Sequence, residues 1–250
     1  MNNSLLNYVL RIADNNLILG HRLSEWCGHG PILEQDIALT NIALDLVGQA
    51  RNYYQLAAEI KGEGATEDDF AYLRDVYEFQ NVLLTEQPNG HFGETITRQF
   101  FFDAFNFYFT QELTKSTNAQ LAAIAEKSLK EITYHLKFSS EWMIRLGDGT
   151  EESHSKMQQA VNDLWMFTGE LFKADELDEE IGTSEVGVVL AEIKPYFDRK
   201  VAQILNEATL ILPENNWMQQ GGKQGRHSEH LGFILAELQF LQRAYPGAKW

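Results

Sequence analysis

Apolar residues recur at alternating steps of three and four along three long segments, and this spacing constrains the fold more than any other feature. The clearest stripe consists of Leu39, Ile42, Leu46, Gln49, Tyr53, Leu56 and Ile60. A second consists of Leu121, Ile124, Ser128, Ile132, His135, Ser139, Trp142 or Met143, and Leu146, and a rougher third of Ile96, Phe100, Asp103, Phe107, Thr110 and Leu113. Such spacing places the side chains on one face of an α-helix. Long amphipathic helices joined by short turns pack antiparallel, so the pattern predicts a helical bundle.

Glycine and proline turns separate the predicted helices. We predict helices over 4–27, 33–61, 67–86, 92–116, 118–147, 153–173, 191–211 and 228–243. The only segment with any strand character is 186–190, and its alternation is weak. The acidic run 175–180 is predicted to be a solvated loop. These features indicate an all-α protein with one domain over residues 1–250, in which later helices pack outside a four-helix core.

Composition excludes several classes of function. The chain has 36 acidic and 20 basic side chains and a net charge of −16, whereas binding to nucleic acid requires a basic surface. Its one cysteine, Cys27, rules out an internal disulfide or a cysteine-rich zinc site. Arg11 and Asp14 interrupt the apolar stretch at the N-terminus, so we expect no signal peptide and no membrane association. The expected location is the cytoplasm.

A bundle of long helices can hold a carboxylate-bridged two-metal centre, but the stripes lack its ligands. Such a centre takes a carboxylate from each of two helices and Glu-x-x-His from each of the other two. The corresponding positions here are Glu25, Leu46, Gln49, Asp103, Ile132 and His135. Only Glu25, Asp103 and His135 carry ligand-type side chains, which cannot balance the charge of two metal ions. His135 is then a buried core histidine, with Asp103 as a candidate partner, or a surviving ligand.

The C-terminal segment from Gly221 combines glycines with charged residues immediately before a helix. Its candidate binding residues are Lys223, Arg226, His227, Glu229 and His230. A helix start beside two cations can hold a phosphate or a partner's carboxylate. The alternative is a flexible glycine-rich connection to a packed helix.

Several short motifs, taken together, resemble one known family. They are Glu25–His29, Leu44–Asn52, Glu86–Gly90, Lys130–Glu131 with Tyr134–Leu136, Met157–Ala160, Asn206–Leu210 and the tail from Gly221 through Gln239. They occur in the order found in the PaaC family, the structural subunits of phenylacetyl-CoA epoxidase. The resemblance runs from about residue 4 to residue 250.

The resemblance implies a ferritin-like four-helix bundle with additional packed helices, inside a multicomponent monooxygenase of phenylacetate catabolism. In that family a homologous catalytic subunit binds the di-iron centre and the acyl-CoA, and a reductase with NADPH and flavin supplies electrons. No cofactor is therefore expected in this chain. The homologous di-iron subunit is the expected partner, with a small bridging subunit and the reductase as further candidates. A register shifted by one residue would place Asp45 and Gly48 at the first Glu-x-x-His pair, which stays broken.

Candidate contacts with the catalytic subunit are the turn residues Gln87, Pro88 and Asn89 together with the C-terminal candidates named above. Two other hypotheses remain open. One is a stand-alone metal-dependent oxidase that uses Glu25, Asp103 and His135. The other is a ferritin-like protein that binds an acyl chain or CoA between its helices.

Overall fold

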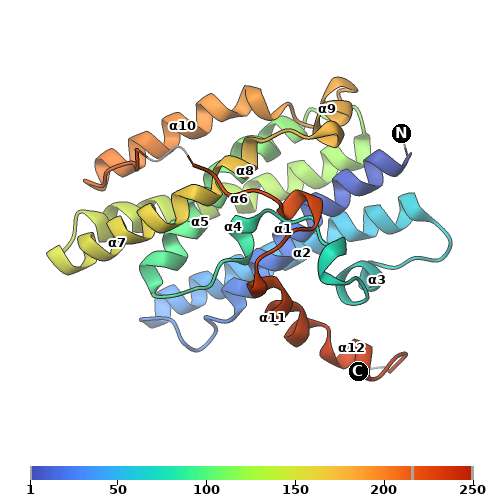
Figure 1. The fold of residues 1–250 in the computed structure, drawn as a ribbon, viewed down its shortest axis with the longest axis horizontal. Coiled ribbons are helices and arrows are strands. Elements are labelled where there is room, and N and C mark those ends of the chain that lie inside the picture. The colour runs from blue at the N-terminus through green and yellow to red at the C-terminus, as the bar shows by residue number, and fades with distance from the viewer. Residues whose placement is uncertain (1, 215–216, 249–250) are drawn as a thin grey trace. The chain divides into compact units, whose positions relative to one another are not determined.

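A computed structural model describes residues 2–214 and 217–248 (Figure 1). Across those two ranges the secondary structure is helical, with turns between the helices and no strand. The all-α prediction is confirmed. The chain divides into two compact units, which we call the terminal unit (Met1–Gln87 with Gly221–Trp250) and the central unit (Pro88–Gln220). Residues 1, 215–216 and 249–250 of the predicted 1–250 domain lie outside the described residues.

The frame of the terminal unit is a pair of long helices, α1 (Asn2–Ser24) and α2 (Leu33–Lys61). They pack side by side along most of their length. A Cβ on Gly20 would lie 3.1 Å from Val47 Cγ2 and 3.2 Å from Leu46 Cβ, so glycine at this position lets the two helices approach closely. The helix predicted over 33–61 is confirmed, and the one predicted over 4–27 ends three residues early.

The prediction of one continuous helix over 67–86 is wrong. The segment contains α3 (Glu67–Tyr72), a 3₁₀ turn η1 (Val76–Glu78) and α4 (Leu83–Glu86). The break allows residues of this segment to contact Asp14, a fully buried carboxylate of α1. Arg74 pairs with Asp14, and the backbone N–H of Gln80 donates to it over 2.8 Å. Because a buried charge must be neutralised and hydrogen-bonded, this contact outweighs local helix propensity.

The central unit is built on α5 (Phe92–Leu113) and α6 (Ala119–Gly147), both close to their predicted bounds. Around them lie α7 (Glu151–Leu164), η2 (Trp165–Phe167), α8 (Gly169–Phe172), α9 (Glu176–Thr183) and α10 (Leu190–Glu207). Phe100, Phe101 and Phe102 are buried, so the aromatic run of α5 is core. None of the helices within 2–214 and 217–248 is long and apolar enough to cross a membrane.

Two local predictions in the central unit are corrected, and a third segment is clarified. The acidic run 175–180 is not a loop: it starts α9, where Asp175 and Asp178 form a capping box and carboxylates favour the helix N-terminus. The predicted helix over 153–173 is divided into α7, η2 and α8. At the start of α8, a Cβ on Gly169 would lie only 2.5 Å from Met218. Segment 186–190 forms no strand, and its Val186 carbonyl accepts from Ser116 Oγ over 2.6 Å.

The C-terminal tail completes the terminal unit. It contains the 3₁₀ turn η3 (Gly222–Gln224), α11 (Glu229–Leu238) and α12 (Phe240–Ala244). The helix predicted over 228–243 is thus interrupted at Gln239. The Nε2 of Gln239 donates to the carbonyls of Ala71 (3.1 Å) and Arg74 (2.9 Å), so the interruption places a buried amide against the end of α3.

Candidate functional site

The terminal unit carries three of the six positions at which the sequence predicts a degenerate metal site. Leu46 and Gln49 lie on the buried face of α2, with 0% and 1% exposure. Glu25 follows the last residue of α1, and its half-exposed carboxylate forms an ion pair with Arg22 over 2.9 Å. Arg22 also donates to the backbone carbonyl of Glu86 from Nε (3.2 Å) and Nη2 (3.0 Å). Glu25 therefore helps to position an arginine that holds the end of α4.

The central unit brings Asp103 of α5 close to His135 of α6. Asp103 Oδ1 accepts from Gln99 Nε2 (2.7 Å), and Oδ2 accepts from Ser139 Oγ (2.8 Å). All four side chains are buried, as is Ile132 one turn before His135. Burial raises the pKa of Asp103 to about 6, although the charge of His135 and the hydrogen bonds from Ser139 and Gln99 oppose the shift.

The Asp103 and His135 side chains are of the type that can bind a metal, whereas Ile132 places an apolar side chain beside them. Within the parts of the chain that the structure describes, no three His, Cys, Asp or Glu side chains gather in a way that could hold a metal ion. A two-metal centre in a helical bundle also needs carboxylates that bridge the metal ions. The side chains of Leu46 and Ile132, at two of the predicted ligand positions, are apolar and cannot bridge metals.

The turn Gln87–Asn89, which the sequence predicts as a partner contact, contains the boundary between the two units, since Gln87 belongs to the terminal unit and Pro88 to the central unit. Gln87 directly follows α4 and is buried, with its Nε2 donating to the carbonyl of Leu83 over 2.8 Å. Pro88 is exposed. Asn89, in the central unit, accepts from Arg98 Nη2 over 2.7 Å. Of these three residues, only Pro88 presents an exposed side chain.

The tail is anchored by a buried ion pair between His227 and Glu86, both with fully buried side chains. His227 Nδ1 lies 2.8 Å from Glu86 Oε2, and Nε2 lies 2.9 Å from the Phe79 carbonyl. A neutral imidazole has one N–H, so two acceptors favour the imidazolium. Burial lowers the pKa of His227, but the hydrogen bond and charge of Glu86 and the Phe79 carbonyl outweigh it, and the net pKa is raised.

The start of α11 does bind a carboxylate, and that carboxylate comes from this chain. The backbone N–H of Ser228, the N-cap residue, donates to Glu86 Oε1 over 2.7 Å. Glu86 Oε2 also accepts from Asn81 Nδ2 over 3.0 Å. The helix N-terminus predicted to hold an external anion is thus occupied by Glu86. Arg226 and Glu229 are exposed, His230 is partly exposed and Lys223 is buried.

The glycines of the tail permit close packing against the preceding segment. A Cβ on Gly222 would lie 2.2 Å from the Asn81 carbonyl oxygen. Gly225 has φ +72°, and a Cβ there would lie 2.3 Å from the Tyr77 carbonyl oxygen. The glycine-rich stretch is therefore a tightly packed turn at these two positions.

Sequence reasoning missed the buried cluster around Asp14. Tyr54 Oη donates to Asp14 Oδ1 over 2.6 Å, and Arg74 forms a two-pronged contact with the same carboxylate. Burial and the charge of Asp14 raise the pKa of Tyr54 well above its usual range. The available signal was Asp14 itself, a charge inside an apolar stretch that must find a partner when buried.

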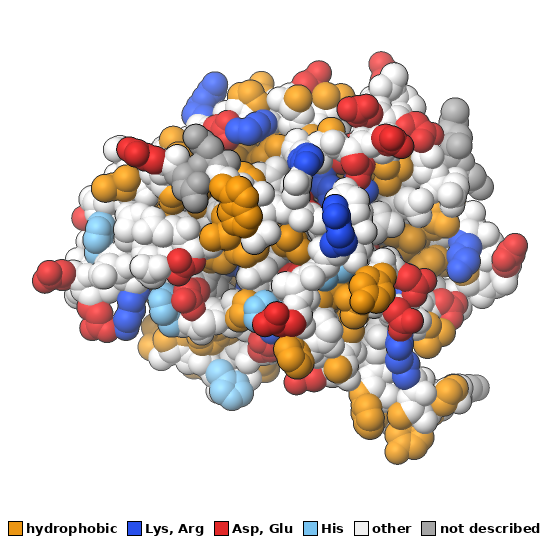
Figure 2. Space-filling view, viewed as in Figure 1, with side chains coloured by type: hydrophobic (Ala, Val, Ile, Leu, Met, Phe, Trp, Pro, Cys, Tyr) orange, Lys and Arg blue, Asp and Glu red, His pale blue; other side chains and the backbone are white. Residues whose placement is uncertain are grey.

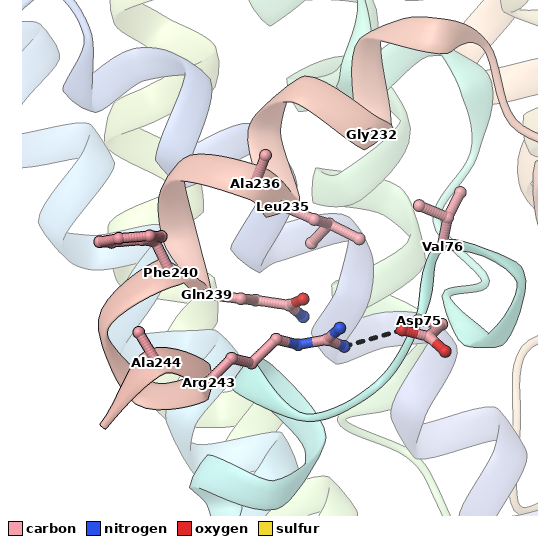
Figure 3. A pocket seen from close by; sticks show the side chains of 9 residues that line it. All are labelled: Asp75, Val76, Gly232, Leu235, Ala236, Gln239, Phe240, Arg243 and Ala244. Atoms are coloured by element: carbon pink, nitrogen blue, oxygen red, sulfur yellow. Dashed lines mark hydrogen bonds and ion pairs between the residues drawn. The ribbon is translucent and has the colours of Figure 1, made fainter. Parts of the chain in front are cut away.

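A hollow of about 510 Å³ lies between η1 and the α11–α12 segment. Figure 3 shows Gln239 and Arg243 pointing toward Asp75 across it, with Phe240 and Ala244 on the same helical segment. Arg243 Nη2 pairs with Asp75 over 2.9 Å and also donates to the Arg74 carbonyl over 2.8 Å. Figure 2 shows hydrophobic side chains gathered around α12, where Phe240 and Leu241 are exposed.

A model of the phenylacetic acid catabolic protein family matches residues 1–250. The chain belongs to this family. The PaaC subunit of 1,2-phenylacetyl-CoA epoxidase from Escherichia coli (strain K12) is 51% identical to it over 248 residues, which cover 99% of this chain and 100% of the relative. The resemblance inferred from short motifs is confirmed along the whole chain.

The sequence predicts a degenerate metal site at six positions of this chain. The structure buries five of them and brings Asp103 and His135 together in the central unit. It leaves Glu25 half exposed and paired with Arg22.

Proposed function

We propose that this chain is a non-catalytic structural subunit of a phenylacetyl-CoA 1,2-epoxidase that acts in phenylacetate catabolism. The observation that carries the proposal is the 51% identity to the PaaC subunit of the epoxidase over essentially the full length of both chains. Being a subunit implies that the chain works with the other subunits of the same complex.

We further propose that α1, α2, α5 and α6 are the four core helices of a ferritin-like bundle whose di-iron ligand set is degenerate. Two pairs of long helices, each pair packed along its length, support this assignment. Leu46 and Ile132, both buried, stand where bridging carboxylates are needed. In this proposal the homologous partner binds the iron, and this chain provides a stable surface on which that partner docks.

In this proposal the cofactors belong to other components of the complex. The homologous di-iron subunit binds the metal and the acyl-CoA, and a reductase with NADPH and flavin delivers electrons. The small bridging subunit and the reductase are further candidate partners.

The test is reconstitution of the epoxidase with and without this chain. We expect the di-iron subunit to co-purify with this chain and to lose most of its stability or activity when the chain is omitted. Iron and manganese bound to the chain alone should be far below one atom per protein. Full epoxidation by the di-iron subunit and reductase without this chain would contradict the proposal.

The buried Asp103 beside His135 is the one observation that favours a metal-dependent oxidase instead. The same metal measurement separates the two functions. One tightly bound iron per chain that disappears in His135→Ala would support the oxidase.

A further inference from the structure

The outer face of α2 is apolar although the helix already has a buried apolar face. Gln35, Ala38, Leu39, Ile42, Leu46, Gln49, Tyr53 and Leu56 form the buried face. On the opposite face Leu33 is 71% exposed, Ile37 51%, Leu44 65% and Val47 42%. A surface helix ordinarily carries charged residues on that side, and a helix that is apolar all round is normally buried. The stripe of Leu33, Ile37, Leu44 and Val47, which we call the α2 stripe, therefore calls for a covering partner.

The geometry of the α2 stripe fits another helix. Its residues, with Thr40 between Ile37 and Leu44 and with Arg51 after Val47, recur at alternating steps of four and three. This is the heptad spacing at which two helices pack at a shallow angle. From Leu33 to Arg51 the stripe extends about 27 Å at the rise of an α-helix. Its four apolar residues expose roughly 400 Å², close to the apolar share of one side of a standard protein interface of about 800 Å².

A hollow of about 230 Å³ adjoins Val47 at the C-terminal end of the α2 stripe. Its lining includes Ala50, Arg51, Tyr54 and Tyr72. Small-molecule sites generally occupy about 300–1,000 Å³, so this hollow suits one large side chain of a partner. Buried anchors of that kind dominate the free energy of association at protein interfaces.

The charged residues around the α2 stripe are mainly acidic, which favours a partner with basic residues. Glu34 and Asp45 flank it on α2, and Glu67 and Asp68 lie at the hollow, where Arg51 Nε pairs with Glu67 over 3.3 Å. Carboxylates outnumber cations, so two copies of this face would bring like charges together. The chain's net charge of −16 also opposes self-association and binding to an anionic lipid surface.

We propose that the α2 stripe docks a helix of the homologous di-iron subunit. That helix presents apolar residues at heptad spacing, basic residues along its edge and one large apolar side chain that enters the hollow beside Val47. The inference rests on the proposed function, because it specifies the surface through which this chain would hold its catalytic partner.

The test compares Leu44→Glu with Ile211→Glu, a matched change at a residue that is 73% exposed and lies in the central unit. Each variant of the full chain is titrated against the purified di-iron subunit, and the dissociation constant is measured. We expect Leu44→Glu to weaken binding by roughly 30-fold or more and Ile211→Glu to leave it unchanged. Ile37→Gln, which adds no charge, should also weaken binding. Thermal unfolding of each isolated variant checks that the fold is intact.

The outcomes separate the surface from the function. If the wild-type chain binds the di-iron subunit and both stripe variants bind equally well, the α2 stripe is not the docking surface, although the proposed function stands. If the wild-type chain shows no binding at all, the proposed function fails. If the isolated wild-type chain forms dimers that Leu44→Glu abolishes, the occupant is a second copy, and the inference is overturned.

Discussion

Removal of the His227 side chain should destabilise the terminal unit strongly. His227→Ala leaves the carboxylate of Glu86 buried, with the Asn81 amide and the Ser228 N–H as its donors from the described contacts. Both side chains of the pair are fully buried, so water cannot replace the lost cation without opening the structure. Removing one partner of a buried pair costs about 3–5 kcal/mol, and we expect a loss of that size in the free energy of unfolding at pH 6.

The cost should depend on pH in a defined direction. The folded-state pKa of His227 is raised above its ordinary value of 6.5. Its stabilising contribution is therefore complete below pH 6.5 and declines as the pH rises through the folded-state pKa. The difference between the wild type and His227→Ala should be largest at pH 6 and smaller at alkaline pH.

Urea unfolding followed by circular dichroism at several pH values provides the measurement. His230→Ala, three residues along the same segment and partly exposed, is the control and should change stability by less than about 0.5 kcal/mol. Glu86→Gln combined with His227→Ala should recover part of the loss, because no buried carboxylate then remains at position 86. A loss below about 1 kcal/mol in the single variant, or no recovery in the double variant, would refute the reasoning.

Three further predictions follow from buried contacts. Because burial raises the pKa of Asp103 to about 6 from 3.8, the wild type should lose about 2.5 kcal/mol relative to Asp103→Asn as the pH rises from 4 to 8, measured by urea unfolding. Gly222→Ala would place a Cβ 2.2 Å from a backbone carbonyl oxygen and should cost about 1–3 kcal/mol in thermal unfolding, whereas Gly232→Ala, with nothing within 4 Å, should be neutral or stabilising. Arg74→Met leaves Asp14 buried without its cation and should cost about 3–5 kcal/mol by the same assay.

Helix position was predictable wherever the signal was local. The stripe from Leu39 to Ile60 predicted α2 with its bounds, and the stripe from Leu121 to Leu146 predicted α6 to within a residue. Both helices bury a face whose period is visible in a single segment of sequence. The buried positions of Leu46 and Ile132 were equally predictable, because each lies on the apolar stripe of its own helix.

The missed features depend on residues far apart in sequence. Arg74 breaks the segment 67–86 because it pairs with Asp14, which lies 60 residues earlier. Glu86 is held by His227 across 141 residues. Charge and hydrogen-bond partners of this kind leave no periodic trace, so the sequence alone does not indicate that Asp14 is buried or that Arg74 is its cation.

The division of the terminal unit between the two ends of the chain has a consequence for synthesis. A ribosome makes α1 through α4 first, and the residues that complete this unit emerge only after the entire central unit. At about 5–20 residues per second, the 141 residues between Glu86 and His227 take roughly 7–28 s to translate. During that interval the Glu86 carboxylate lacks its partner His227. The surface that the tail later covers is then accessible to chaperones. A premature stop codon just before Gly221 would therefore remove the tail contacts of the terminal unit, which includes the N-terminal helices. The central unit would keep all of its own residues.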